Sequence, residues 1–260
     1  MTRFACGVEY DGSAYRGWQR LSHAPTVQAE VERALGRVVD HPLGVVCAGR
    51  TDTGVHATGQ VIHFETEAPR DERALLLGGN SNLPEDVAFS WVKAVPPEFH
   101  ARFSALARSY RYVIANRSTR SALLSRRVAW VRAPLDAGRM HEAAQALLGE
   151  HDFSSFRAAG CQAKHPIRAL TRLNVWRSAD FVYLDVEANA FLHHMVRNIA
   201  GVLIEIGMGA KPVSWTGELL ALRQRELAAP TARPQGLYLT AVRYPEQFGL
   251  PLTSSVLCYG

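Results

Sequence analysis

Lysine is scarce in this 260-residue chain. Of the 29 basic residues only Lys93, Lys164 and Lys211 are lysines, and the other 26 are arginines. The 24 acidic residues leave a formal charge of +5. Two explanations stay open: the codon bias of a GC-rich genome, and a surface for RNA or phosphate, because arginine offers a planar fork to phosphate and stacks on bases. The net charge does not decide between them.

Long apolar runs are also missing. No stretch approaches the roughly 18 apolar residues of a membrane-spanning helix, and the N-terminus lacks the apolar region of a secretory signal peptide. The four cysteines, Cys6, Cys47, Cys161 and Cys258, stand far apart, and nothing in their spacing demands a disulfide. These absences predict a cytoplasmic protein, with Cys6 and Cys47 as small core residues.

The usual signatures of metal and nucleotide sites are absent as well. The chain has no C-x-x-C pair, no P-loop and no G-x-G-x-x-G, and its nearest approach to H-E-x-x-H ends on Gln145 instead of histidine. We therefore expect no metal and no other cofactor. With 47% hydrophobic and 20% charged residues, the composition is that of a globular protein with ample chain for a core.

Two series of strands and helices follow one another. Apolar periodicity in the first half predicts strands at 4–10, 45–47, 61–64 and 87–95 and helices at 26–38 and 70–77. After Pro97 the pattern restarts, with strands at 108–115, 170–176, 181–187 and 237–244 and helices at 136–148, 192–206 and 214–225. Thr26 and Asp136 are the expected N-caps of two of these helices.

This alternation predicts an α+β fold. We expect two α/β halves, a ferredoxin-like or RRM-like pseudo-repeat, on an extended, mostly antiparallel sheet with helices on one side. The halves share no clear sequence similarity. We place the first at 1–105, with the most polar loop of the chain, and the second at 106–245. A short tail follows at 246–260.

That loop is the segment 49–57 (GRTDTGVHA), between two predicted buried strands. Rigid strands often hold catalytic groups on such loops, and its glycines let the backbone turn tightly. One interpretation is an Asx-turn, in which Asp52 bonds its own backbone. Another is an aspartic protease, because Asp52-Thr53-Gly54 reads D-T-G. That chemistry needs two carboxylates, however, and the chain has no second copy.

A third interpretation comes from resemblance. Together with segment 60–64 (QVIHF), the loop resembles the signature of the tRNA pseudouridine synthase A family. Further blocks resemble that family in the same order along nearly the whole chain: 10–13 (YDGS), 17–19 (GWQ), 107–112 (ARSYRY), 191–199 (FLHHMVRNI) and 236–239 (GLYL). Thr53 is a mild variation, since alanine is common there.

The resemblance implies a fold and an activity. It implies two α/β halves with a basic cleft between them, and a homodimer. It implies isomerisation of uridine to pseudouridine at positions 38, 39 and 40 in the anticodon stem-loop of tRNA, without cofactor. Asp52 matches the catalytic aspartate, which would attack C1′ or C6 or remove the C2′ proton. It must be ionised for any of these roles, so we expect a cation nearby.

Four further positions match family residues. The resemblance makes Arg197 the cation beside Asp52, although a solvated helix arginine would look the same in sequence. Arg50 resembles a wedge that fills the place of a flipped base, and a simple phosphate contact is the alternative. Tyr110 matches the tyrosine that stacks on the flipped uracil, and Leu237 matches an apolar residue packed on that base.

The strand at 108–115 carries further RNA-binding character. Arg108, Tyr110 and Tyr112 share one face, which pairs cations with aromatic rings as RNA-binding surfaces do. For Tyr112 we favour a core tyrosine with a satisfied hydroxyl. The histidines His56, His193 and His194 are expected to be structural. The main alternative function is a non-catalytic tRNA- or RNA-binding protein, which would have no use for a buried Asp52.

Overall fold

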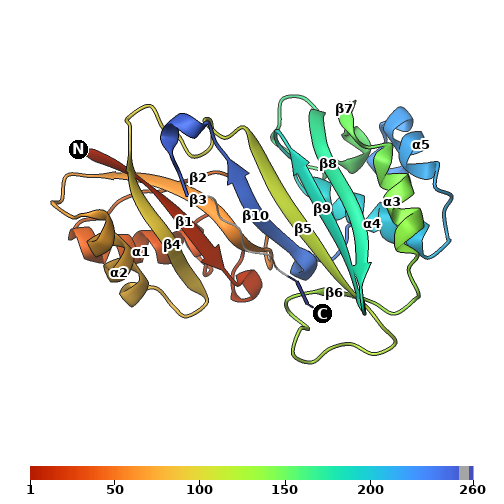
Figure 1. Ribbon diagram of the computed structural model, residues 1–260, viewed down its shortest axis with the longest axis horizontal. Helices are drawn as coiled ribbons and strands as arrows, with labels where there is room; N and C mark the ends of the chain where they lie inside the picture. Colours follow the sequence, from red (N-terminus) through yellow and green to blue (C-terminus); the bar gives the residue numbers. More distant parts are fainter. Residues whose placement is uncertain (252–257, 260) are drawn as a thin grey trace. The chain divides into compact units, whose positions relative to one another are not determined.

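A computed structural model describes residues 1–251 and 258–259, and it divides into two compact units (Figure 1). Unit 1 consists of Met1–Arg108 and the strand and turn that begin at Tyr238. Unit 2 consists of Ser109–Leu237 and the last residues of the chain. The sequence predicts that the final strand belongs to the second half. Contacts group it with unit 1, because it pairs in parallel with a strand of that unit.

Unit 1 is a set of mostly antiparallel strands with two helices. Its strands run in the order β4-β1-β3-β10, and β2 pairs with β3. The helices α1 and α2 pack on each other, and α2 also packs on β4. The bounds are β1 Thr2–Tyr10, α1 Val27–Val39, β2 Val46–Cys47, β3 His56–Thr66, α2 Glu72–Asn82, β4 Val87–Val95 and β10 Leu237–Arg243, with short turns η1 Gly12–Ala14 and η5 Glu246–Phe248.

Unit 2 follows the same plan. Its strands run β5-β9-β8-β7, with β6 parallel to β5, and α3 packs on β8 and on α4 and α5. The bounds are β5 Ala107–Asn116, β6 Ala129–Val131, α3 Ala137–Gln145, β7 Gly149–Asp152, β8 Ile167–Ser178, β9 Phe181–Ala188, α4 Met195–Gly207 and α5 Trp215–Leu222, with short turns η2 Ser154–Phe156, η3 Arg225–Leu227 and η4 Pro234–Gly236. The predicted mostly antiparallel α+β class is confirmed.

Strand β1 is buried on both faces, although large and small side chains alternate along it. Phe4 lies at 4% exposure, and the intervening Ala5 is fully buried. Ala5 packs in a small second core with Phe99 and Phe248. The alternation therefore separates two covered faces, one lined by large and one by small residues, and does not mark a solvent face.

The helix starts follow the predicted caps with one difference. Asp136 caps α3 by accepting from the backbone N–H of Arg139 at 3.0 Å. Thr26 occupies the N-cap position of α1 but makes no capping bond, and its buried hydroxyl has no partner within the described residues. Cys6 is fully buried as expected, and burial raises the pKa of Cys47 to about 11.

Two predictions concern the chain's environment and its end. Within the described residues, no helix combines the length and the apolar character needed to cross a bilayer. The predicted tail at 246–260 begins with the turn η5, and its residues 252–257 and 260 lie outside the described residues.

Tyr112 is the core tyrosine that the sequence predicted. It is fully buried, burial raises its pKa, and its hydroxyl donates to the carbonyl of Arg233 at 2.7 Å. Replacing Tyr112 with phenylalanine should lower the free energy of unfolding by about 0.5–1.5 kcal/mol, because the hydrogen bond of its hydroxyl is lost. Urea denaturation measures this, and an unchanged midpoint would show that the bond contributes nothing.

Candidate active site

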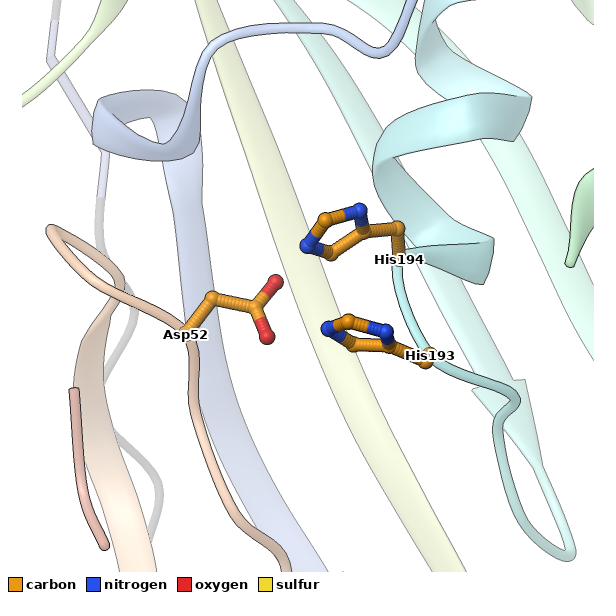
Figure 2. A group of neighbouring side chains, drawn as sticks. All are labelled: Asp52, His193 and His194. Carbon is orange, nitrogen blue, oxygen red and sulfur yellow. The ribbon is translucent and has the colours of Figure 1, made fainter. Parts of the chain in front are cut away.

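The loop that carries Asp52 joins β2 to β3 in unit 1. Asp52 is half-buried, Arg50 is exposed, and Gly54 has a positive φ of 76° where the chain turns. The backbone N–H of Val55 donates to the carbonyl of Asp52 at 3.1 Å, which closes the turn. Figure 2 shows the Asp52 carboxylate projecting from this loop.

Buried polar groups hold this loop in place. Thr51 is only 7% exposed, and its hydroxyl lies 2.8 Å from that of Tyr10. Its carbonyl accepts from the backbone N–H of Trp18 at 3.0 Å. The amide of the fully buried Gln60 donates to the carbonyl of Gly49 at 2.6 Å. The loop is thus fixed at Gly49 and Thr51, just before Asp52, and a fixed carboxylate is what catalysis at a defined atom requires.

His56 ends the loop as a structural residue. It is 1% exposed and stacks on Tyr238, with ring centroids 4.6 Å apart. Its Nδ1 lies 3.2 Å from Oδ1 of Asp11. This contact, with hydrogen bonds from Ser13, holds the pKa of Asp11 well below its usual range. The expected structural role agrees with this burial.

Arg108 supports the loop from the start of β5. Its Nη2 donates to the carbonyl of Ala48 at 3.1 Å and to that of Arg102 at 2.6 Å. Ala48 lies two residues before Arg50, so the fork of Arg108 fixes the entry to the loop. Unit 1 therefore brings Arg50, Asp52 and Arg108 to one loop and its stem.

Three other candidate residues belong to unit 2, whose main segment ends at Leu237. Tyr110 on β5 is 9% exposed and meets the ring of Phe191 edge to face, with centroids 5.1 Å apart. Arg197 on α4 is half-buried, and its Nε donates to the carbonyl of Ala232 at 2.9 Å. Leu237 begins β10 and is 6% exposed.

Two adjacent histidines precede α4. His194 is the N-cap and has a positive φ of 60°, and the rings of His193 and His194 lie 3.9 Å apart at 40° (Figure 2). The backbone N–H of His193 lies 3.4 Å from the Cys161 sulfur. This ring contact could not be predicted from the sequence, because neighbouring residues rarely face each other.

The site's supporting residues were not predicted. Gln60, Phe191 and Thr51 lie in segments that resemble the family, but the sequence alone assigns them no structural role. A polar residue between apolar ones is the signal for Gln60, since a buried amide needs partners.

Comparison with known proteins identifies the family. A family model described as tRNA pseudouridine synthase matches residues 7–104 and 143–245. The chain belongs to the tRNA pseudouridine synthase family. The resemblance inferred from the motifs is therefore confirmed. The segments that match the tRNA pseudouridine synthase model contain Arg50, Asp52, Arg197 and Leu237, whereas the stretch between them contains Tyr110.

Curated tRNA pseudouridine synthases are similar over nearly the whole chain. One named tRNA pseudouridine synthase A, from Shewanella baltica (strain OS155 / ATCC BAA-1091), is 59% identical over 249 residues, which cover 96% of this chain and 95% of the relative. A protein of the same name from Shigella boydii serotype 4 (strain Sb227) is 57% identical, with coverages of 96% and 92%. A third, from Hydrogenovibrio crunogenus (strain DSM 25203 / XCL-2), is 56% identical, with 96% of each chain covered.

A more distant likeness concerns a solved structure. A chain of "Crystal Structure of a Cbf5-Nop10-Gar1 Complex" aligns with a TM-score of 0.38 and 11% identity, over 91% of this chain and 48% of that chain. This likeness is too low to support a conclusion, and the family assignment depends on the sequence matches.

Proposed function

We propose that this protein isomerises uridine to pseudouridine in tRNA, at positions 38, 39 and 40 of the anticodon stem-loop, without a cofactor. The family match, with relatives at 56–59% identity, carries this proposal. The firmly held Asp52 loop supports it, because the reaction needs a carboxylate at one defined atom of the nucleotide.

The reaction breaks one bond and forms another without net oxidation. The C1′–N1 glycosidic bond breaks, the uracil turns, and C5 bonds to C1′. The hydrogen of C5 leaves as a proton, and N1 gains a proton, so the product is an isomer of uridine. Asp52 acts as a nucleophile at C1′ or C6, or as the base that removes the C2′ proton. Each route uses the ionised carboxylate, and we assign to Arg197 the task of keeping it ionised.

The remaining residues act on the flipped nucleotide. A uridine within a stem must leave its stack, and we assign to Arg50, which is exposed beside Asp52, the filling of the vacated space. Tyr110 stacks on the uracil and takes part in proton transfer at C5, and Leu237 packs against the same ring. Arg108 contributes to RNA binding while it holds the loop entry.

Tritium release tests the proposed reaction. Transfer RNA labelled with tritium at uridine C5 should release tritium to water on incubation with the protein, because C5 exchanges its hydrogen for a carbon. The control is equally labelled tRNA whose positions 38 to 40 carry no uridine. This tRNA should release no tritium. A protein that binds the labelled tRNA and releases no tritium would be the alternative, a non-catalytic RNA-binding protein.

We further propose a cytoplasmic homodimer. Light scattering behind size exclusion should then give twice the 28.7 kDa of one chain. A mass of one chain at working concentrations would remove this part of the proposal and leave the reaction untouched.

A further inference from the structure

A strongly basic segment lies between β5 and α3 in unit 2. From Arg117 to Leu135 the chain has no acidic residue. Most of the segment is exposed, including Leu123 at 92%. It also lies outside the residues that the family model matches. Its five arginines are Arg117, Arg120, Arg126, Arg127 and Arg132.

A small pocket opens beneath this segment. It has a volume of about 130 Å³, and its walls include Arg120, Trp130, Arg233 and Gln235. The side-chain oxygen of Gln235 is buried and accepts no hydrogen bond from any described residue. A buried acceptor without a partner is rare in folded proteins and calls for a donor from outside the chain.

The pocket walls are rigid. The Tyr112 hydroxyl donates to the carbonyl of Arg233, immediately before the turn η4 that carries Gln235. A Cβ on Gly236 would lie 2.7 Å from the carbonyl oxygen of Val113, so this turn lies directly against β5. On the other side, the indole N–H of Trp130 donates to the carbonyl of Arg117 at 2.9 Å.

Two guanidinium groups at the pocket are unpaired. Within residues 1–251 and 258–259, the side chains of Arg120 and Arg233 have no hydrogen bond and no ion pair, and both residues are exposed. Free guanidinium forks suit phosphate oxygens. The Gln235 oxygen suits an N–H donor, which every nucleobase offers. A cavity of roughly 150 Å³ takes one benzene-sized ring, so this pocket admits one base ring through its open side.

We propose that this pocket binds one nucleotide of the tRNA, other than the uridine that is isomerised. Arg120 and Arg233 contact its phosphates, Gln235 accepts from its base, and Trp130 flanks the ring. The separation along β5 supports a second nucleotide: the pocket residue Ala115 lies five residues after Tyr110, about 16 Å along a strand. The odd spacing also turns their side chains to opposite faces. This proposal rests on the proposed tRNA substrate.

Salt-dependent binding separates the two kinds of contact. We expect the double variant Arg120→Gln/Arg233→Gln to weaken tRNA binding and to flatten the slope of log K against log salt by about 0.7–0.9 per lost phosphate contact. Gln235→Leu should weaken binding about fivefold to tenfold with an unchanged slope, because it removes a base contact. Fluorescence anisotropy with labelled tRNA at several salt concentrations gives both quantities.

Two control variants test whether the change in slope comes from the charge at the pocket. Arg73→Gln, on the exposed side of α2, removes a charge elsewhere and should change the slope less than Arg120→Gln alone. Arg120→Lys should restore the slope, since the charge remains. Melting temperatures near that of the parent verify that the variants fold, and the control Arg73→Gln should keep the parent's rate of tritium release.

The outcomes separate this proposal from the proposed reaction. Parent-like affinity and slope in the double variant and in Gln235→Leu, with active parent enzyme, would overturn the pocket assignment alone. A parent that binds tRNA through these residues and releases no tritium would overturn the reaction alone. A large excess of free CMP or AMP should not displace tRNA. Displacement would overturn the tRNA assignment in favour of a site for small nucleotides.

Discussion

Replacing Asp52 with asparagine should abolish turnover while the tRNA affinity stays within about tenfold of the parent, roughly 1.4 kcal/mol. The amide keeps the shape of the side chain but is neither a nucleophile nor a base, so we expect a loss of about 10³-fold or more. The loop should keep its place, because it is held through Thr51 and Gln60. Single-turnover tritium release and anisotropy measure the two effects separately.

Asp40 supplies the matched control. It is exposed at the C-cap of α1 with a φ of 59°, a conformation that asparagine adopts readily. Asp40→Asn should therefore keep both the rate and the affinity of the parent. Full activity in Asp52→Asn would remove the aspartate from its catalytic role, and an affinity loss far beyond tenfold would make it a binding residue.

Replacing Gly17 with alanine should both destabilise the protein and slow the reaction. Gly17 has a φ of +92°, and a Cβ there would lie 2.7 Å from the carbonyl oxygen of Thr51. The strained backbone alone costs about 1–3 kcal/mol. Relief of the clash must shift the residue next to Asp52, and a displacement of about 1 Å can cost 10²-fold in rate. Urea denaturation and tritium release at saturating tRNA measure these losses.

Gly44 is the control for this substitution. It is exposed, has no positive φ, and a Cβ there would have no neighbour within 4 Å. Gly44→Ala should change neither stability nor rate appreciably. If Gly17→Ala lowers stability but leaves the rate at saturation intact, the loop does not transmit the shift to Asp52.

The long elements of the fold follow from sequence, whereas two of its short strands do not. Strand β4 lies where the alternation at 87–95 predicted it, and α1 begins directly after Thr26. Strands β6 and β7, with three and four residues, were missed because so few positions show no period. Gly149 follows the predicted helix at 136–148 and is the first residue of β7, with a φ of 94°.

The candidate site was also predicted only in part from the sequence. The Asp52 loop was predicted from its polar residues and glycines between two apolar strands. Its end was misplaced, because β3 begins at His56, five residues before the predicted strand start at Val61. Neither the Arg108 contacts with loop carbonyls nor the ion pair of Arg111 with Asp185 at 2.6 Å could be predicted, since partners so far apart in sequence have no local signal.

Arginine side chains close several loops of this lysine-poor chain by donating hydrogen bonds to backbone carbonyls. One Nη of Arg157 binds the carbonyls of Cys161 and Ala163, and one Nη of Arg108 binds those of Ala48 and Arg102. Each set of hydrogen bonds shortens the freely moving part of a loop and so lowers the conformational entropy of that loop. Secreted proteins often obtain such closure from cystine. Here arginine side chains perform that task, and the other Nη of Arg108 also donates to the carbonyl of Ala105 at 3.3 Å. An ammonium group has no second nitrogen to reach a further carbonyl.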